Sequence, residues 1–262
     1  MGNKKCIKLE TLISLYENNI PTVQIAEKVG TSISNVSQRL KKAGYIVIRD
    51  YLKDRRIRTN KKKVDLEFFN TIDTKEKAYF LGIMYADGSV CKNQFYLKLN
   101  DKDVLDAFKE CLKCEYEVKP VKNTKAYILT ISSKKMCADL IKHGCTPNKT
   151  RTIRFPKLDK NLWSHFIRGF LDGDGCILVN RTLGTSGINF TSASLMFLKD
   201  LEEVLTPYIT HSHISKEKSD VWHLRCHGKQ ILNILEYIYS DANIYMHRKY
   251  EKYKLLGSFK TG

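Results

Sequence analysis

The sequence predicts an α+β protein with two pseudo-symmetric αββαββα halves that follow a small, all-α helix-turn-helix domain. Three observations carry this expectation: helical spacing of apolar residues near the N-terminus, alternating apolar residues in short segments farther on, and one sequence frame that occurs twice. A chain of 262 residues with 42% hydrophobic residues is long enough to bury such cores. The expected domains are the helix-turn-helix at 1–48, a basic linker at 49–65, and the two halves at 66–150 and 151–262.

The first element is a helix-turn-helix in residues 22–45, with residues 9–18 as a supporting helix. Gly30 can take the left-handed conformation that ends the first helix, and Thr31 or Ser32 can cap the second. The apolar residues expected to pack are Ile25, Ala26 and Val29 on one helix and Ile33, Val36 and Leu40 on the next. The polar residues of the second helix that suit phosphates and base edges in a DNA major groove are Ser34, Asn35, Ser37, Gln38 and Arg39.

The segment that follows is strongly basic: residues 49–63 contain eight Lys or Arg against two Asp. Such a run can lie along a phosphate backbone, where it adds salt-dependent and sequence-independent affinity. Arg55, Arg56 and Arg58 are the expected contacts. Because this run lies directly beside the helix-turn-helix, DNA binding is favoured over a role as a protein–protein module.

The charge and cysteine content narrow the class of protein. The formal net charge is +17, from 45 Lys and Arg against 28 Asp and Glu. Such an excess indicates a polyanionic partner, with nucleic acid ahead of an anionic membrane surface. No apolar run approaches the length of a membrane span, and the N-terminus has no apolar signal region. Among eight cysteines only Cys111 and Cys114 have a ligand-like spacing, so we expect free thiols in the reducing cytoplasm.

One frame occurs twice, as YFLGIMYADGSV at residues 79–90 and as FIRGFLDGDGCI at residues 166–177. The copies lie 87 residues apart, which is enough for a half-domain of four strands and two or three helices. In both halves the segments that follow have strand, strand, helix, strand, strand and helix patterns in the same order. The equivalent pairs are Gly82 with Gly169, Ala86 with Gly173, Asp87 with Asp174, and Gly88 with Gly175.

Each copy of the frame places small residues four positions apart on one helical face. These residues are Gly82 and Ala86 in the first copy and Gly169 and Gly173 in the second. Two such faces allow helix backbones to pack at unusually short range. We therefore expect the two motif helices to form the interface between the halves, with their C-terminal ends side by side.

Asp87 and Asp174 stand at these helix ends, where their carboxylates face mutual repulsion and the negative end of each helix dipole. Divalent cations would offset that cost. Mg²⁺ is the natural candidate because it prefers oxygen ligands and keeps several waters, with Mn²⁺ as a substitute. The preceding residues, Ala86 and Gly173, are expected at the metal as well. Each Asp-Gly pair could instead mark only a helix-to-strand turn, but two of them behind equivalent small-residue stripes favour a site.

These motifs resemble those of the LAGLIDADG homing endonucleases, in the double-motif, single-chain form and here with an N-terminal helix-turn-helix. The resemblance spans residues 66–257. It includes GCTPNKTRTIRFP, which leads through Trp163 into the second motif, and the closing IYMHRKYEKYKLLG with Arg248 and Lys249. It implies two halves whose sheets form a saddle in the DNA major groove, and a metal-dependent site that cuts both strands.

The resemblance also implies roles for individual residues. The metal ligand of the family is the last acidic residue of each motif, which maps to Asp87 and Asp174. The earlier acidic position, held by Asp172 in the second motif and Tyr85 in the first, is not the usual ligand. The family places lysines and polar residues near the metals, and the candidates here are Lys98, Lys134 and Lys229, with His227.

DNA-reading residues are expected at alternate positions of the strands, because side chains alternate between the two faces of a sheet. The candidates are Lys92, Gln94, Tyr96, Lys98, Lys119, Asn180, Arg181, Asn189, Thr191 and Arg225. The intervening residues, expected to pack beneath the helices, are Phe95, Leu97, Leu99, Ile188 and Phe190.

Two functions of different class follow. The first is a site-specific, metal-dependent endonuclease that makes double-strand breaks in DNA, intron-encoded or free-standing. The alternative is a binding protein on the same scaffold, either a maturase for intron RNA or a transcription regulator that does not cleave. Retention of both aspartates favours the nuclease, because a pure binder has no need of two repelling carboxylates. With both motifs in one chain, we expect a monomer.

Overall fold

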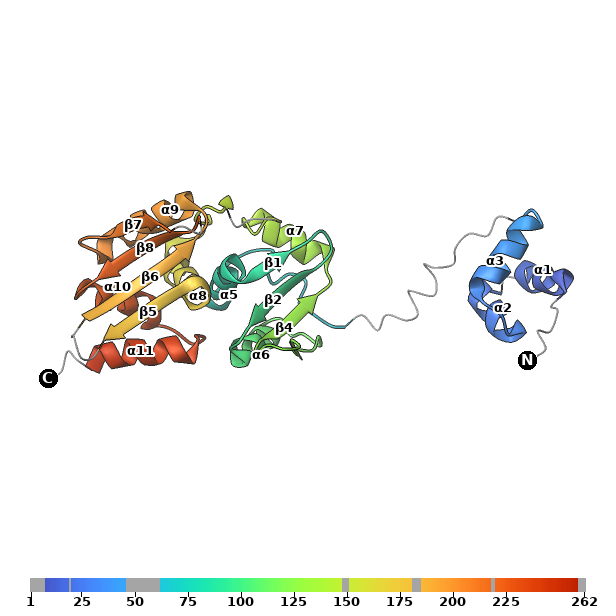
Figure 1. Ribbon diagram of the computed structural model, residues 1–262, viewed down its shortest axis with the longest axis horizontal. Helices are drawn as coiled ribbons and strands as arrows, with labels where there is room; N and C mark the ends of the chain where they lie inside the picture. The colour runs from blue at the N-terminus through green and yellow to red at the C-terminus, as the bar shows by residue number, and fades with distance from the viewer. Residues whose placement is uncertain are drawn as a thin grey trace. The chain divides into compact units, whose positions relative to one another are not determined.

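The computed structural model describes residues 8–18, 20–45, 62–147, 151–180, 185–217 and 220–258. The chain divides into two compact units, Met1–Lys61 and Lys62–Gly262, and each is described by itself (Figure 1). The expected α+β class is confirmed, because the first unit is helical and the second combines helices with two antiparallel sheets. Four expected DNA contacts lie outside the described residues, namely Arg55, Arg56, Arg58 and Arg181. The expected domain limits stay predictions.

The first unit contains three helices, α1 (Leu9–Glu17), α2 (Thr22–Val29) and α3 (Ile33–Lys42). As the sequence predicted, Gly30 is left-handed with φ 67°, and the Ser32 hydroxyl accepts a hydrogen bond of 3.2 Å from the Asn35 amide. The small core of this unit consists of Leu12, Ile25, Ala26, Val36 and Leu40. The expectation for Ile33 was wrong: it is the first residue of α3, and its side chain is 46% exposed.

The first half of the second unit has the order αββαββα. Its elements are α5 (Lys75–Ala86), β1 (Gly88–Val90), β2 (Phe95–Leu99), α6 (Lys102–Cys111), β3 (Lys119–Pro120), β4 (Tyr127–Ile131) and α7 (Lys134–Lys142). The Thr74 hydroxyl caps α5 by accepting a hydrogen bond of 3.3 Å from the Lys77 amide. The strands pair antiparallel in the order β1-β2-β4-β3.

The second half repeats this arrangement. Its elements are α8 (Trp163–Asp174), β5 (Gly175–Asn180), β6 (Thr185–Ser192), α9 (Leu195–Leu205), β7 (His213–Lys216), β8 (Trp222–His227) and α10 (Gln230–Tyr239), followed by α11 (His247–Ser258). The sheet order β5-β6-β8-β7 matches that of the first half. Helix α11 has no counterpart there and packs along edge strand β5, where the Lys252 ammonium donates a hydrogen bond of 2.7 Å to the Ile177 carbonyl.

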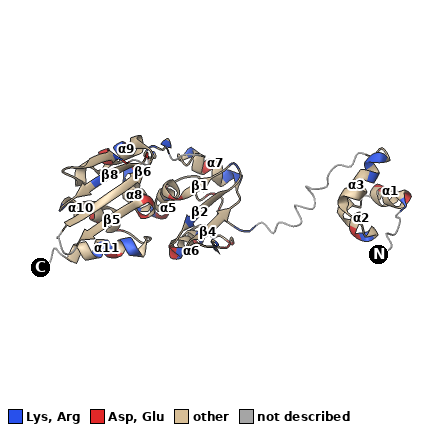
Figure 2. Ribbon diagram, in the orientation of Figure 1, with Lys and Arg blue, Asp and Glu red and all other residues tan. Residues whose placement is uncertain are grey.

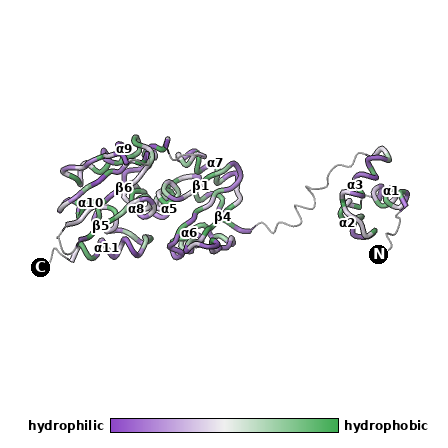
Figure 3. The backbone as a smooth tube through the Cα atoms, in the orientation of Figure 1, coloured by the Kyte–Doolittle hydropathy of each residue, from purple (hydrophilic) through white to green (hydrophobic). Residues whose placement is uncertain are grey.

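Each sheet has one buried and one open face. Burial alternates along β2, where the side chains of Phe95, Leu97 and Leu99 are buried against the helices as expected. Ile188 and Phe190 of β6 are buried in the same way. Hydrophobic and hydrophilic stretches alternate along the backbone in Figure 3. One continuous core spans both halves, so the second unit is held together across the junction of α5 and α8.

None of the helices in the described ranges is both long and apolar enough to cross a membrane. The seven cysteines within these ranges are free thiols, as the sequence predicted for them.

Candidate active site

Helices α5 and α8 cross with their backbones in direct contact, at the glycines that the sequence singled out. A Cβ atom on Gly82 would lie 2.2 Å from the Phe166 carbonyl oxygen. A Cβ atom on Gly169 would lie 2.0 Å from the Tyr79 carbonyl oxygen. These two contacts are equivalent, because Tyr79 and Phe166 occupy the same position in the repeated frame, as do Gly82 and Gly169. The crossing is therefore a pseudo-two-fold interface in which each helix uses the same surface.

The same crossing brings Asp87, at the end of α5, next to the C-terminal end of α8. Asp87 caps α5 and is half-buried, and Asp174 is the last residue of α8 and is exposed. A Cβ atom on Gly173 would lie 2.3 Å from the Ala86 Cβ and 3.0 Å from Oδ2 of Asp87. The Asp87 carboxylate thus lies close against Gly173, the residue directly before Asp174. The predicted convergence of the two helix ends is present.

The interface departs from two-fold symmetry at one pair of positions. The Tyr79 hydroxyl of α5 donates a hydrogen bond of 2.9 Å to Oδ2 of Asp172 in α8. At the symmetry-related place, Phe166 and Tyr85 pack edge to face with ring centroids 5.0 Å apart. One side of the crossing therefore carries a buried polar pair and the other an aromatic pair.

The Asp172 side chain is enclosed by the protein and is not open to solvent. Its side chain is fully buried and accepts two further hydrogen bonds, from the Tyr239 hydroxyl at 2.6 Å and the Met246 amide at 2.9 Å. Burial raises the pKa of this carboxyl, and the hydrogen bonds act in the opposite direction. These contacts tie α5, α10 and the start of the C-terminal segment to α8, which agrees with leaving Asp172 out of the metal ligands.

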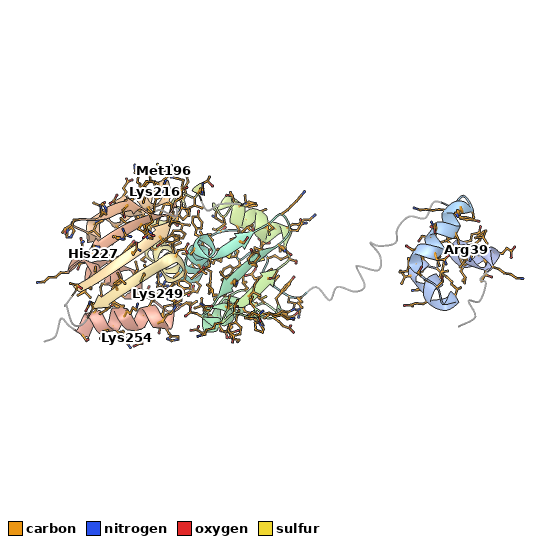
Figure 4. All side chains as sticks on the ribbon, viewed as in Figure 1. Arg39, Met196, Lys216, His227, Lys249 and Lys254 are labelled. Carbon is orange, nitrogen blue, oxygen red and sulfur yellow. The ribbon has the colours of Figure 1, made fainter. Side chains whose placement is uncertain are left out.

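A buried lysine lies at the C-terminal end of α8, and the sequence did not single it out for the site. Lys249 of α11, labelled in Figure 4, is 2% exposed. Its ammonium donates hydrogen bonds to the carbonyls of Leu171 at 2.5 Å, Asp172 at 2.6 Å and Gly175 at 2.7 Å, and so caps the C-terminus of α8.

The positive charge of Lys249 interacts with the negative charges of Asp172 and Asp87. Burial lowers its pKa from 10.5 to about 8, while the negative charges of Asp172 and Asp87 raise it. The available sequence signal was its spacing, because Lys249 shares a face of α11 with Tyr253 and Leu256, which pack on the core. A lysine on such a face needs buried acceptors, and the end of α8 provides them.

Strand register places the first of the three predicted lysines near the site. Strand β1 pairs with β2 from Gly88 opposite Leu97, so Lys98 lies one position nearer the Asp87 end of the sheet. Lys98 is exposed on the open face. Of the three lysine candidates, it is the one that the register brings to an aspartate.

The other two predicted lysines lie at the opposite ends of their sheets. Strand β4 ends with Ile131 opposite Phe95, and Lys134 begins α7 just beyond it. Strand β8 ends at His227, and Lys229 stands before α10. Strands rise about 3.3 Å per residue, so these lysines are separated from the aspartates by about 10 Å or more along the sheets. Neither is brought to the helix crossing.

The residues at the crossing fit a divalent cation that prefers oxygen. The donors are two carboxylates, with the backbone carbonyls of Ala86 and Gly173 beside them, and Gly173 leaves room next to Asp87. Within the described ranges no group of three or more His, Cys, Asp or Glu is placed to hold a metal, at the crossing or at Cys111 and Cys114. Water or a ligand oxygen would therefore have to complete any coordination shell.

The open faces of the two sheets carry most of the predicted DNA-reading residues. Among these candidates, Tyr96, Lys98, Lys119, Asn189, Thr191 and Arg225 lie at open-face positions, and Asn180 ends β5. The expectation of a strand position was wrong for Lys92 and Gln94, which lie in the turn between β1 and β2. That turn is closed by a hydrogen bond of 2.8 Å from the Cys91 amide to the Gln94 carbonyl. Blue Lys and Arg residues occur on both units in Figure 2.

Comparison with known proteins bears first on the second half. Residues 164–239 match a family model described as a LAGLIDADG-like domain. This stretch runs from α8 to α10 and includes Asp174. A search of curated proteins found no match.

Similar solved structures include the I-LtrWI LAGLIDADG homing endonuclease bound to target DNA, with 17% identity over 75% of this chain and 92% of that chain and a TM-score of 0.48. The LAGLIDADG meganuclease I-AabMI bound to uncleaved DNA is 11% identical over 69% of this chain and 88% of its own, with a TM-score of 0.48. Full-length DUF199/WhiA from Thermatoga maritima is 17% identical over 75% of this chain and 65% of its own, with a TM-score of 0.49. At these values no residue role is transferred to this chain.

Proposed function

We propose that the chain is a site-specific, metal-dependent DNA endonuclease of the homing type, intron-encoded or free-standing, which makes double-strand breaks. The observation that carries the proposal is the crossing of α5 and α8. It is so close that a Cβ atom on Gly173 would lie 2.3 Å from the Ala86 Cβ and 3.0 Å from Oδ2 of Asp87. Two carboxylates held together at helix C-termini are costly without a cation. The match of residues 164–239 to a LAGLIDADG-like domain supports the same function.

In this proposal, the carboxylates of Asp87 and Asp174 and the carbonyls of Ala86 and Gly173 would hold Mg²⁺, for which Mn²⁺ could substitute. A cation bound there supplies stabilisation of a phosphate oxygen and an activated water. Lys249 fixes the last turn of α8 through three carbonyls, and so positions the backbone that carries Gly173 and Asp174. Both motifs belong to one chain, so a monomer completes the site.

Double-stranded DNA is the proposed partner, and the open faces of the two sheets are its contact surfaces. Lys98 and Lys119 supply positive charge on the first sheet, where both are exposed. In the N-terminal unit, we propose that α3 enters the major groove, because Ser34, Asn35 and Gln38 are exposed on it and Arg39 is half-exposed. Arg55, Arg56 and Arg58 of the linker would then add phosphate contacts.

The experiment is cleavage of a randomised DNA library by the full chain, with Mg²⁺ and with EDTA, next to the double variant Asp87→Asn and Asp174→Asn. The proposal expects one family of sites to be cut on both strands with Mg²⁺ alone, and no cleavage by the double variant. Specific binding of DNA without cleavage would overturn it in favour of a regulator. Specific binding of intron RNA without DNA cleavage would favour a maturase.

A further inference from the structure

The open face of the second sheet has an unusual charge composition for a surface that meets DNA. Across the described strands β5, β6, β8 and β7, Arg225 is the one Lys or Arg on this face. Lys216 of β7 points to the other side, with its ammonium 5.6 Å from the ring centroid of Trp222. The first sheet, in contrast, exposes Lys98 and Lys119 on its open face.

The charge of Arg225 is balanced within the protein. Its Nη1 donates a hydrogen bond to the Ser215 hydroxyl, and its Nη2 donates one of 3.2 Å to Oε1 of Glu217. The same Glu217 oxygen lies 3.1 Å from Nε2 of His223, close enough for an ion pair but without an aligned hydrogen bond. Held in this way, the guanidinium has little charge to offer a phosphate, and its position is fixed before any ligand arrives.

The polar side chains next to Arg225 do not make all their possible hydrogen bonds within the described residues. Asn189 lies opposite Arg225 in the strand register, and its Nδ2 is 3.0 Å from Nδ1 of His223. Its Oδ1 is buried and has no hydrogen-bond partner in the part of the chain that the structure describes. Buried polar atoms are normally satisfied, so the side chains beside Arg225 form a polar cluster in which the hydrogen bonds are not all made.

We propose that Arg225 is the residue through which the second sheet reads a guanine in the major groove, and that Glu217 makes this contact selective. The inference rests on the proposed DNA-binding function. A planar guanidinium can donate two parallel hydrogen bonds to O6 and N7 of guanine, which no other base presents together. Glu217 holds the fork in place and repels phosphates, so a misplaced Arg225 gains nothing from the DNA backbone. The first sheet, with its free lysines, then supplies affinity rather than sequence discrimination.

The test is binding selection of the full chain on a randomised DNA library in EDTA, which prevents the proposed cleavage. For wild type, Arg225→Lys and Glu217→Gln, the base preference at each position and the salt dependence of affinity are measured. Arg225→Lys keeps the charge but loses the fork, so preference for guanine at one position falls by about 5- to 150-fold while the salt dependence is unchanged. Glu217→Gln weakens the same preference for guanine. It also steepens the slope of log affinity against log salt concentration by about one, because Arg225 becomes free to bind a phosphate.

Matched controls make the same chemical changes on the helix side of the sheet. Arg154→Lys alters the residue that pairs with Asp200 of α9, and Glu203→Gln alters an exposed residue of α9. Both should keep the wild-type preference at every position. If Arg225→Lys also keeps it, or if all positions weaken equally, the inference is overturned while DNA binding stands. Absence of any base preference in the wild type overturns the proposed function itself.

Discussion

Asp172 shows how a single buried acid can be structural within a helix crossing that also carries the candidate metal ligands. It is fully buried and receives hydrogen bonds from three different segments, including Tyr79 of the other half. A carboxylate in such a place is tolerated only while its hydrogen bonds are complete. Asp87 is half-buried and Asp174 is exposed, so neither carboxylate has the fully buried environment of Asp172.

The first prediction concerns the donor to that carboxylate. Tyr79→Phe removes one hydrogen bond from Asp172 and keeps the aromatic ring over which Arg168 lies. We expect the free energy of unfolding to fall by about 1–3 kcal/mol. Urea denaturation monitored by circular dichroism measures the change. Tyr96→Phe, on the open face of β2, is the control and should leave the transition midpoint unchanged; equal midpoints for both variants would contradict the role given to Asp172.

The second prediction concerns Lys249 and pH. Its pKa is about 8 in the folded chain against an ordinary 10.5. Between these values the unfolded chain holds the proton and the folded chain does not, so raising the pH favours the folded state. Below pH 8 both states are protonated, and the contribution of this group no longer changes with pH.

The measurement compares wild type with Lys249→Met in EDTA. The free energy of unfolding of the wild type should rise relative to the variant from pH 8 towards 10.5, by on the order of 1 kcal/mol per pH unit. The difference between the two proteins should stay flat from pH 6 to about 7.5. A difference with the opposite slope, or with none above pH 8, would mean that Lys249 is not buried as an ammonium against α8.

At the scale of elements, the junction of α5 and α8 decides whether the site exists. The third prediction is that Gly82→Ala lowers the free energy of unfolding by about 1–3 kcal/mol and abolishes cleavage. The new methyl group would stand 2.2 Å from a backbone oxygen, which cannot move without separating the helices. Gly257→Ala in α11 is the control, because its methyl group meets nothing within 4 Å and alanine favours a helix. Similar stability for both variants would refute the tight crossing.

The sequence predicted the helices and strands better than it predicted the side-chain contacts between distant segments. The order of helices and strands, the Gly82 and Gly169 contacts and the meeting of the motif ends all followed from local spacing and from the repeat. Lys249 and the Glu217–Arg225 pair did not, because each depends on side chains from segments that meet only in the folded chain. Lys134 and Lys229 were expected near the aspartates, but strand direction, which spacing alone does not give, places them at the far ends of the sheets.

At the scale of the whole molecule, the N-terminal unit is proposed to widen the DNA contact. The fourth prediction is that deletion of residues 1–61 weakens DNA binding at physiological salt and makes it less salt-dependent, because linker phosphate contacts are lost. The deletion stops before Lys63, whose carbonyl accepts a hydrogen bond of 2.9 Å from the Glu115 amide in the second unit. Fluorescence anisotropy across a salt series measures the effect. Unchanged affinity and slope would remove this unit from the DNA contact.

The central claim is that α5 and α8 bring Asp87 and Asp174 into one cation-dependent site. It is tested most directly by the single variants Asp87→Asn and Asp174→Asn on the DNA target selected by the wild type, with both strands labelled and Mg²⁺ present. Each variant should bind the target within about threefold of the wild type and cut either strand at least about 100-fold more slowly. If either variant cleaves both strands at the wild-type rate, the two aspartates do not form the site.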